Sequence, residues 1–291
     1  MFGKILCPVD FSPPSHAAVA VAARIAAADR SELVLAHAFH FPSVAAGAEG
    51  PLPGTTIQLA MDDEKSALTA VAEHASKLGA RVTTRFLDGV PWQHMVDLAG
   101  NEGFDLIVVG THGRTGLKRL LIGSVAEKIV RHAPTSVLVV RGNPDGPLFD
   151  HVLCPIDFSE GSSLVVERAG ELANPSGAGL MLLHAIELPL AASGDPLLKD
   201  PIMFLDHRMQ IELDRYRDEV VARHKLPVTA EVLTGTPVEL MLAKVEEDRT
   251  FDLVVVGTHG RTGLKRVLLG SVAEKMVRHA PCSVLVVRGR D

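Results

Sequence analysis

Short apolar runs alternate along the chain with longer stretches in which apolar residues recur at helical spacing. In the first half, the apolar runs predict five strands, at residues 5–9, 33–38, 82–87, 106–109 and 136–141. The stretches between them predict four helices, at residues 13–28, 57–78, 91–102 and 124–132. Strands that are joined by helices form parallel sheets, so we expect an α/β fold, a doubly wound sheet with helices on both faces. The expected strand order, numbered along the chain, is 3-2-1-4-5.

The second half of the chain repeats the first at an offset of 147 residues. Residues 110–142 recur at 257–289 with four changes in 33 positions. A repeat this long is a domain rather than the unit of a solenoid. We therefore predict two tandem domains of the same fold, joined by an exposed linker that is rich in Pro and Gly. The predicted domains are residues 1–143 and 150–291, and the predicted linker is 144–149.

Composition and charge exclude several classes of protein. The net charge of −6 and the 4% of aromatic residues argue against nucleic acid as a partner, because nucleic acid demands a basic face and stacking rings. The apolar runs fall far short of the ~18 residues that a membrane span needs. The apolar stretch before Asp10 is too short for a signal peptide, and three cysteines make no disulfide framework. We expect a cytoplasmic protein with neither nucleic acid nor membrane as a partner.

Glycines follow the fourth predicted strand of each half and lead into the last predicted helix. Their spacing is G-x2-G-x9-G-S, at Gly110, Gly113, Gly123 and Ser124 and again at Gly257, Gly260, Gly270 and Ser271. Glycines after a strand allow positive φ and a close approach of backbone N–H groups to a ligand. The start of the following helix favours an anion, and Arg114 and Arg261 add positive charge. The pattern predicts a phosphate-binding loop in each half.

Two well-known phosphate-binding motifs do not fit this loop. A P-loop needs lysine where Leu117 stands, and the dinucleotide fingerprint G-x-G-x-x-G does not follow the first strand. A purely structural interpretation stays open, because Ser124 and Glu127 match a capping box and the glycines would then serve tight turns. We expect Ser124 to cap the helix in either case.

Ligands of doubly wound sheets bind outside the carboxyl ends of the strands, at the point where the strand order reverses. Asp10 follows the first strand and Gly110 follows the fourth, so both are expected to face this crevice. Asp157 repeats Asp10 in the second half. An ordinary role at the start of a helix is the alternative for both aspartates.

The histidines near the crevice carry no predicted catalysis. His112 and His259 lie within the glycine loop, but the local sequence offers them no partner carboxylate or nucleophile. His37 and His184 end apolar strands, and no cluster around them has the spacing of metal ligands. We expect these two to be hydrogen-bonded core residues.

The glycine pattern, an opening strand that ends in Asp-Phe-Ser and a second strand that ends in His-Ala together resemble the ATP-binding class of universal stress proteins. The resemblance spans essentially the whole chain as two tandem family domains. It implies that adenine or ribose contacts Asp10, Ala38, Asp157 and Ala185, and that the glycine and serine positions above hold ribose and phosphates. The family commonly has valine where the two alanines stand, but this contact is largely through the backbone.

The same resemblance implies how the two halves associate. Universal stress proteins typically dimerise through the last strand, which here would make the two halves an internal pseudo-dimer. An apolar strand at the edge of a sheet favours such pairing. Pairing between separate chains, as a homodimer, is the alternative.

The sequence therefore predicts an ATP-binding regulatory protein of the stress response, which signals through nucleotide occupancy or slow turnover in one or both halves. ADP or AMP could replace ATP, and Mg²⁺ could accompany the phosphates, although we assign no metal ligand. Two alternatives stay open: an enzyme that hydrolyses adenine nucleotides or transfers adenylate, and a scaffold with vestigial sites. The enzyme would need a glycine-rich pyrophosphate loop where DFSPPS stands. We assign no catalytic residue and expect at most a slow ATPase.

Overall fold

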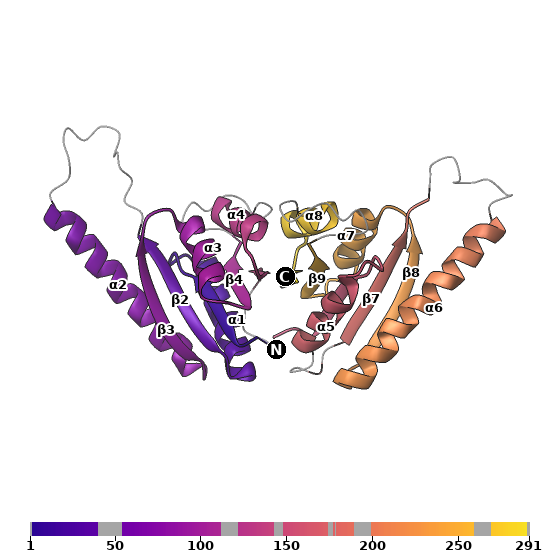
Figure 1. Cartoon of the computed structure of the whole chain (residues 1–291), viewed down its shortest axis with the longest axis horizontal. Coiled ribbons are helices and arrows are strands. Elements are labelled where there is room, and N and C mark those ends of the chain that lie inside the picture. The colour runs from indigo at the N-terminus through magenta and orange to yellow at the C-terminus, as the bar shows by residue number, and fades with distance from the viewer. Residues whose placement is uncertain are drawn as a thin grey trace, which may run out of the picture. The chain divides into compact units, whose positions relative to one another are not determined.

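The computed structural model describes residues 2–39, 54–111, 122–142, 148–173, 177, 179–188, 199–258 and 269–289. Contacts divide the chain into two compact units, Phe2–Val140 and Arg141–Asp291. Both units have the same α/β architecture (Figure 1). Among the described helices, none is long and apolar enough to cross a lipid bilayer.

The first unit is built on five parallel strands in the order β3-β2-β1-β4-β5, which confirms the predicted order. Its strands are β1 (Lys4–Pro8), β2 (Glu32–Phe39), β3 (Arg81–Asp88), β4 (Leu106–Gly110) and β5 (Ser136–Val140). Its helices are α1 (Pro13–Asp29), α2 (Gly54–Lys77), α3 (Pro91–Asn101) and α4 (Ser124–His132).

The second unit repeats this arrangement, with its strands in the order β8-β7-β6-β9-β10. Its strands are β6 (His151–Pro155), β7 (Gly179–Ile186), β8 (Val228–Thr234), β9 (Leu253–Gly257) and β10 (Ser283–Val287). Its helices are α5 (Ser162–Ala173), α6 (Lys199–His224), α7 (Pro237–Glu247) and α8 (Ser271–His279).

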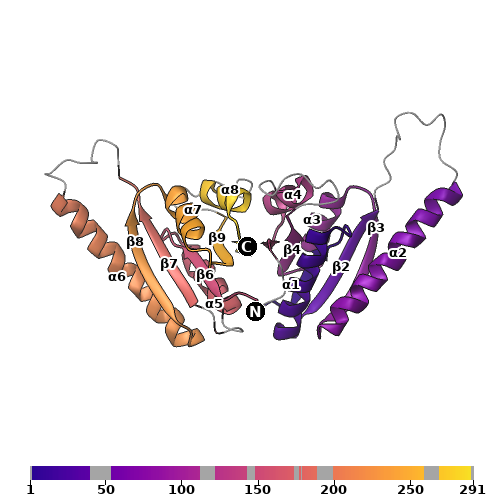
Figure 2. The same cartoon turned by 180° about the vertical axis from the view of Figure 1, so that it is seen from behind.

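A pair of helices covers each face of each sheet, as predicted. In the first unit α1 packs against α2, and α3 packs against α4. Right-handed crossovers put α1 and α2 on one face as the chain moves outward from β1 to β3, and put α3 and α4 on the other face as the chain returns to β4. The long helix α2 runs along β2 and β3, and α6 runs in the same way along β7 and β8 (Figures 1 and 2).

The central strands are apolar and buried on both faces, as in other parallel sheets. Ile5, Leu6 and Cys7 of β1 have no exposed surface, and neither has Cys154 of β6. Burial raises the pKa of the Cys7 and Cys154 thiols far above their ordinary range, and it raises the pKa of Cys282 to about 12. The cysteines therefore behave as small apolar core residues.

We expect all three thiols to resist alkylation in the folded protein, because the thiolate is the reactive species and burial disfavours it. Mass spectrometry after treatment with iodoacetamide at pH 8 should find no modified cysteine in the folded chain and three in urea. Rapid modification of Cys7 or Cys154 without urea would show that the sheet of that half opens in solution.

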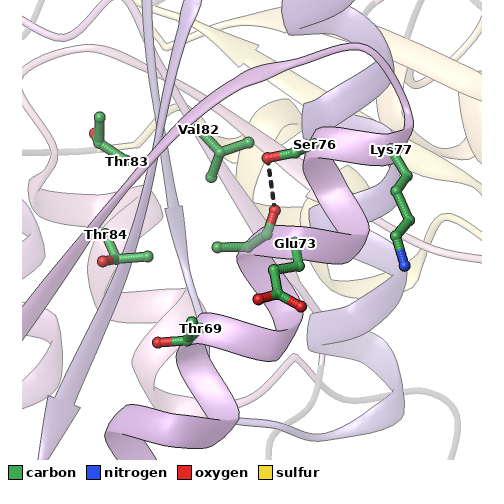
Figure 3. A pocket seen from close by; sticks show the side chains of 8 residues that line it. Thr69, Glu73, Ser76, Lys77, Val82, Thr83 and Thr84 are labelled. Carbon is green, nitrogen blue, oxygen red and sulfur yellow. Dashed lines mark hydrogen bonds between the residues drawn. The ribbon is translucent and has the colours of Figure 1, made fainter.

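Side chains shield the outer edge strand of each sheet. Arg85 Nη1 donates to the Thr84 carbonyl of β3 (3.3 Å), and Gln210 Nε2 of α6 donates to the Ala230 carbonyl of β8 (3.3 Å). Such shielding limits pairing with other chains. A hollow of about 500 Å³ lies between α2 and the first residues of β3, and it is lined mostly by polar side chains such as Glu73 (Figure 3). This hollow lies at the amino end of β3, whereas the predicted ligand crevice lies at the carboxyl ends of the strands.

Candidate functional site

The two central strands of each sheet stop pairing before they reach their carboxyl ends. β1 pairs with β4 at Ile5 and Leu6 only, although β1 continues to Pro8 and β4 to Gly110. β6 and β9 pair over the equivalent two residues. The strand order reverses between these strands, which is where doubly wound sheets bind ligands. The fold thus brings Asp10, which comes shortly after β1, to the same edge as Gly110.

One carboxylate oxygen of the aspartate in each half holds the turn after the first strand. Asp10 Oδ1 accepts hydrogen bonds from the N–H (3.0 Å) and the hydroxyl (2.6 Å) of Ser12. Asp157 Oδ1 accepts from the N–H (3.0 Å) and the hydroxyl (2.7 Å) of Ser159 and from the hydroxyl of Ser162 (2.9 Å). These bonds give both aspartates a structural role at the start of a helix, which the sequence left open as the alternative to ligand contact. The same bonds also fix each carboxylate at the edge of the crevice.

The residue after each aspartate has a backbone conformation that is rare outside glycine. Phe11 has φ 63° and Phe158 has φ 58°, which costs a non-glycine residue roughly 1–2 kcal/mol. The ring of each packs on the histidine of the second strand, with ring centroids 4.7 Å apart for Phe11 and His37 and 4.5 Å apart for Phe158 and His184. Conformations of this kind concentrate at functional sites.

Glycine, not serine, precedes the first helical residue of α4 and of α8. Gly123 is the N-cap of α4 (φ −66°, ψ 150°) and Gly270 is the N-cap of α8 (φ −60°, ψ 150°), so neither N-cap residue offers a capping side chain. Ser124 and Ser271 are the first helical residues. The prediction that Ser124 caps the helix is therefore wrong, because a capping side chain must precede the first turn. The first-turn N–H groups, which have no partner within a helix, therefore receive no side-chain oxygen from the N-cap residue of α4 or of α8.

The glutamate near each helix start pairs further along the helix. Glu127 Oε1 lies 3.8 Å from Arg131 Nη2, and Glu274 Oε1 lies 3.4 Å from Arg278 Nη2. Each arginine is one turn closer to the end of its helix than the glutamate. The Glu127 amide donates to the Gly123 carbonyl, as in an ordinary first turn. The predicted capping box does not form. The positive ends of α4 and α8 are thus left to favour an anion.

Three of the four described glycines of the motif do not serve positive φ. Gly123 and Gly270 have negative φ, and Gly110 is also outside the left-handed region, so that prediction is wrong for these three. Gly110 is needed for a close approach, because a Cβ there would lie 2.5 Å from the carbonyl oxygen of Pro14 in α1. The Gly123 N–H donates to the Thr111 carbonyl (2.5 Å), which ties the start of α4 to the end of β4.

The second strand of each half brings an alanine to the same edge. Ala38 is the penultimate residue of β2 and is buried, and Ala185 of β7 is half-buried. His37, which precedes Ala38, is buried and hydrogen-bonded as predicted. Its Nδ1 lies 2.6 Å from the Val9 carbonyl oxygen, and its Nε2 lies 2.8 Å from Glu64 Oε2.

The second half repeats this contact. His184 is 5% exposed, which confirms its predicted place in the core. Its Nδ1 lies 2.7 Å from the carbonyl oxygen of Ile156, the residue before Asp157. In both halves the second strand therefore holds the residue that precedes the aspartate.

The chain matches proteins of one known family along nearly its whole length. A sequence model of the universal stress protein family matches residues 1–141 and residues 148–288. The chain belongs to the universal stress protein family. It is 30% identical over 303 residues to a universal stress protein of Mycolicibacterium smegmatis, which covers 98% of this chain and 97% of the relative. It is 31% identical over 300 residues to a universal stress protein of Mycobacterium tuberculosis, with 98% and 96% covered.

Solved structures of universal stress proteins have the same fold. The crystal structure of a universal stress protein from Archaeoglobus fulgidus matches with a TM-score of 0.71 at 21% identity, and the match covers 99% of this chain and 98% of that one. At this identity the likeness shows the fold alone. The family places this chain among stress-response proteins with two tandem domains.

Most predicted site residues of this universal stress protein lie at the carboxyl edge of their sheet. Ten of them are described there: Asp10, Ala38, Gly110, Gly123 and Ser124 in the first half, and Asp157, Ala185, Gly257, Gly270 and Ser271 in the second. The other four, Gly113, Arg114, Gly260 and Arg261, lie outside the described residues, as do His112 and His259.

A turn that the glycine motif does not predict lies at the same carboxyl edge of each sheet in this universal stress protein. After the third strand of each half, Gly89 (φ 127°) donates its N–H to the Phe39 carbonyl (3.1 Å), and Gly235 (φ 150°) donates to the Ile186 carbonyl (2.9 Å). These glycines do need positive φ, and they lie beside the end of the second strand. The signal in the sequence is a Gly-x-Pro tripeptide that recurs in both halves.

Proposed function

We propose that this universal stress protein binds an adenine nucleotide at the carboxyl edge of one or both sheets, and acts in the cytoplasmic stress response through nucleotide occupancy or slow turnover. One observation carries the proposal: because the N-cap is glycine, the first-turn amides of α4 and of α8 receive no side-chain oxygen from the N-cap position. Helix starts usually carry Ser, Thr, Asp or Asn for this purpose. A phosphate group can take that place, because the amides and the helix dipole both favour an anion.

The other residues of the edge suit the remaining parts of the nucleotide. The Asp10 turn and the Ala38 backbone lie beside the strand-order reversal, where the family resemblance puts ribose and adenine. We propose ATP as the ligand, with ADP and AMP as weaker ligands of the same site. Mg²⁺ would accompany the phosphates and keep most of its waters. Pairing of the two halves, or of two chains, through the last strands remains a prediction from the resemblance.

The position of the carboxylate supports a binding role. Asp10 Oδ1 already accepts two hydrogen bonds from Ser12, which fix its position at the edge of the crevice. We therefore propose a binding role for Asp10 and Asp157 rather than fast catalysis.

Equilibrium dialysis of refolded, nucleotide-free protein against ATP tests the proposal. We expect up to two ATP molecules per chain, measured with Mg²⁺ and with EDTA to find the contribution of the ion. Lack of binding of ATP, ADP and AMP at millimolar concentration would contradict the proposal.

Trp92 allows the first half to be followed alone, because it is the single tryptophan of the chain. Its ring lies 5.3 Å from the His132 ring and 5.4 Å from Lys128 Nζ, both on α4. A nucleotide at the start of α4 should change the tryptophan fluorescence, whereas a nucleotide at α8 should be seen by dialysis only.

A further inference from the structure

A histidine side chain ends the pairing of the first two strands in each half. The Val9 N–H, one residue beyond β1, donates to the Ala36 carbonyl (2.8 Å). In a regular parallel ladder, the Val9 carbonyl would then accept from the Ala38 N–H. It lies instead 2.6 Å from His37 Nδ1, which must be the donor because a carbonyl only accepts. Among the described residues, no hydrogen bond joins the Ala38 amide to the segment that follows β1.

The second half has the same arrangement. The Ile156 N–H donates to the Leu183 carbonyl (2.8 Å), and the Ile156 carbonyl lies 2.7 Å from His184 Nδ1. Main-chain groups of a strand alternate in direction, so the N–H and C=O of Ala38 and Ala185 point to the side where the first strand has ended. In each half the histidine that precedes the alanine donates to the carbonyl of Val9 or Ile156, with which the alanine N–H would otherwise pair.

The orientation of the His37 ring is fixed from several sides. Glu64 of α2 holds Nε2 at 2.8 Å, and the rings of Phe11 and Phe86 lie 4.7 and 5.5 Å from the imidazole centroid. The ring therefore has little freedom to release the Val9 carbonyl. A partner on the second ring nitrogen is a common way to fix an imidazole that works through the first.

We propose that His37 and His184 are positioning residues, which keep the N–H and C=O of Ala38 and Ala185 available for the edge of an adenine ring. The inference rests on the proposed function and adds the source of base recognition. One backbone N–H beside a C=O complements a base that presents an acceptor nitrogen beside a donor amino group. Adenine and guanine both present one acceptor beside one donor, but in the opposite order, because position 6 carries an amino donor in adenine and a carbonyl acceptor in guanine. In the nucleotide orientation that matches adenine to the alanine N–H and C=O, guanine would place donor against donor and acceptor against acceptor. The histidines therefore act through the alanine main chain to favour adenine.

Leucine in place of both histidines tests the proposal. In the variant with His37→Leu and His184→Leu, the Val9 and Ile156 carbonyls become free to pair with the Ala38 and Ala185 amides. We expect the affinity for ATP to fall about tenfold, the effect of one or two lost hydrogen bonds, and the preference for ATP over GTP to fall with it. Inorganic tripolyphosphate, which has no base, should bind within twofold of its original affinity.

Asparagine is the matched control, because its side-chain amide nitrogen can take the place of His Nδ1 and donate to the same carbonyl. The variant with His37→Asn and His184→Asn should recover most of the lost ATP affinity. If the histidines only support the fold, the leucine substitutions should change the affinities for ATP and tripolyphosphate by the same factor, or change neither. Either result would overturn the proposal while ATP binding by the unaltered protein upheld the proposed function.

A measurement on the unaltered protein decides the case if the leucine variant does not fold. The amide NMR signals of Ala38 and Ala185 should shift on addition of ATP and stay unchanged with tripolyphosphate. Unchanged signals at both alanines with saturating ATP would overturn the proposal. If the unaltered protein binds no adenine nucleotide, the proposed function fails and this inference falls with it.

Discussion

Aspartate in place of Gly123 and Gly270 is expected to raise the stability of the fold and to abolish most nucleotide binding. Both glycines are N-caps with extended backbone (φ −66° and −60°), the conformation in which an aspartate side chain accepts from first-turn amides. The new carboxylate would occupy the amides that we assign to phosphate, and its charge would repel the ligand. Loss of two charge-assisted hydrogen bonds corresponds to about a hundredfold lower affinity.

The two effects have opposite signs, which makes this substitution informative. An N-cap aspartate should raise the free energy of unfolding by a few tenths of a kcal/mol over glycine, so lost binding cannot be blamed on misfolding. Calorimetric titration with ATP and urea unfolding measure the two effects. Alanine at the same positions is the control, because it brings no capping oxygen and should reduce binding less. ATP affinity that survives both aspartates would show that the phosphates bind elsewhere.

Alanine in place of Gly110 is expected to destabilise the first unit, for a reason unconnected with ligands. The new Cβ would lie 2.5 Å from the Pro14 carbonyl oxygen, 2.6 Å from the Pro14 carbonyl carbon and 3.0 Å from the Ser15 nitrogen. These are backbone atoms at the start of α1, so no side-chain rotation relieves the clash. Overpacking of this kind costs about 1–3 kcal/mol.

Gly100 provides the matched control for this substitution. A Cβ at Gly100, in the last turn of α3, would lie 3.6 Å from Pro134 Cγ, which is an ordinary contact distance. Gly100→Ala should therefore stabilise the unit by up to about 1 kcal/mol, since alanine favours helix over glycine. Urea unfolding followed by Trp92 fluorescence reports on this unit. Equal stability of Gly110→Ala and the unaltered protein would refute the close approach of β4 and α1.

The architecture follows from the sequence because its signals are local and repeated. Apolar runs of about five residues, each followed by a helical stretch, are enough to predict strands, helices and the order 3-2-1-4-5. The start of α1 is equally clear, since Ser12 caps the helix and Pro13 is its first residue. Because the sequence repeats, each strand and helix is predicted in both halves.

The two errors at the site have physical causes that the local sequence does not contain. Ser-x-x-Glu fits a capping box if Ser124 is the N-cap, but the helix starts one residue earlier because Gly123 already takes the N-cap position. The need for glycine at position 110 comes from Pro14, which lies far away in sequence and beside it in the fold. A pattern read along the chain cannot distinguish glycine for positive φ from glycine for a close neighbour.

The proposed base-binding side of the site is also beyond the reach of the sequence. His37 is readily predicted as a core residue, but its bond to the Val9 carbonyl depends on the register of β1 and β2. That register decides which backbone amide of β2 has no partner on β1. His184 makes the equivalent bond to the Ile156 carbonyl in the second half.

A crystal structure of the protein with ATP tests the central claim most directly. We expect phosphate oxygens within about 2.7–3.2 Å of first-turn amide nitrogens of α4, of α8, or of both. ATP bound with its phosphates away from both helix starts would contradict the account, as would helix starts that a protein side chain fills while saturating ATP leaves no density beside them.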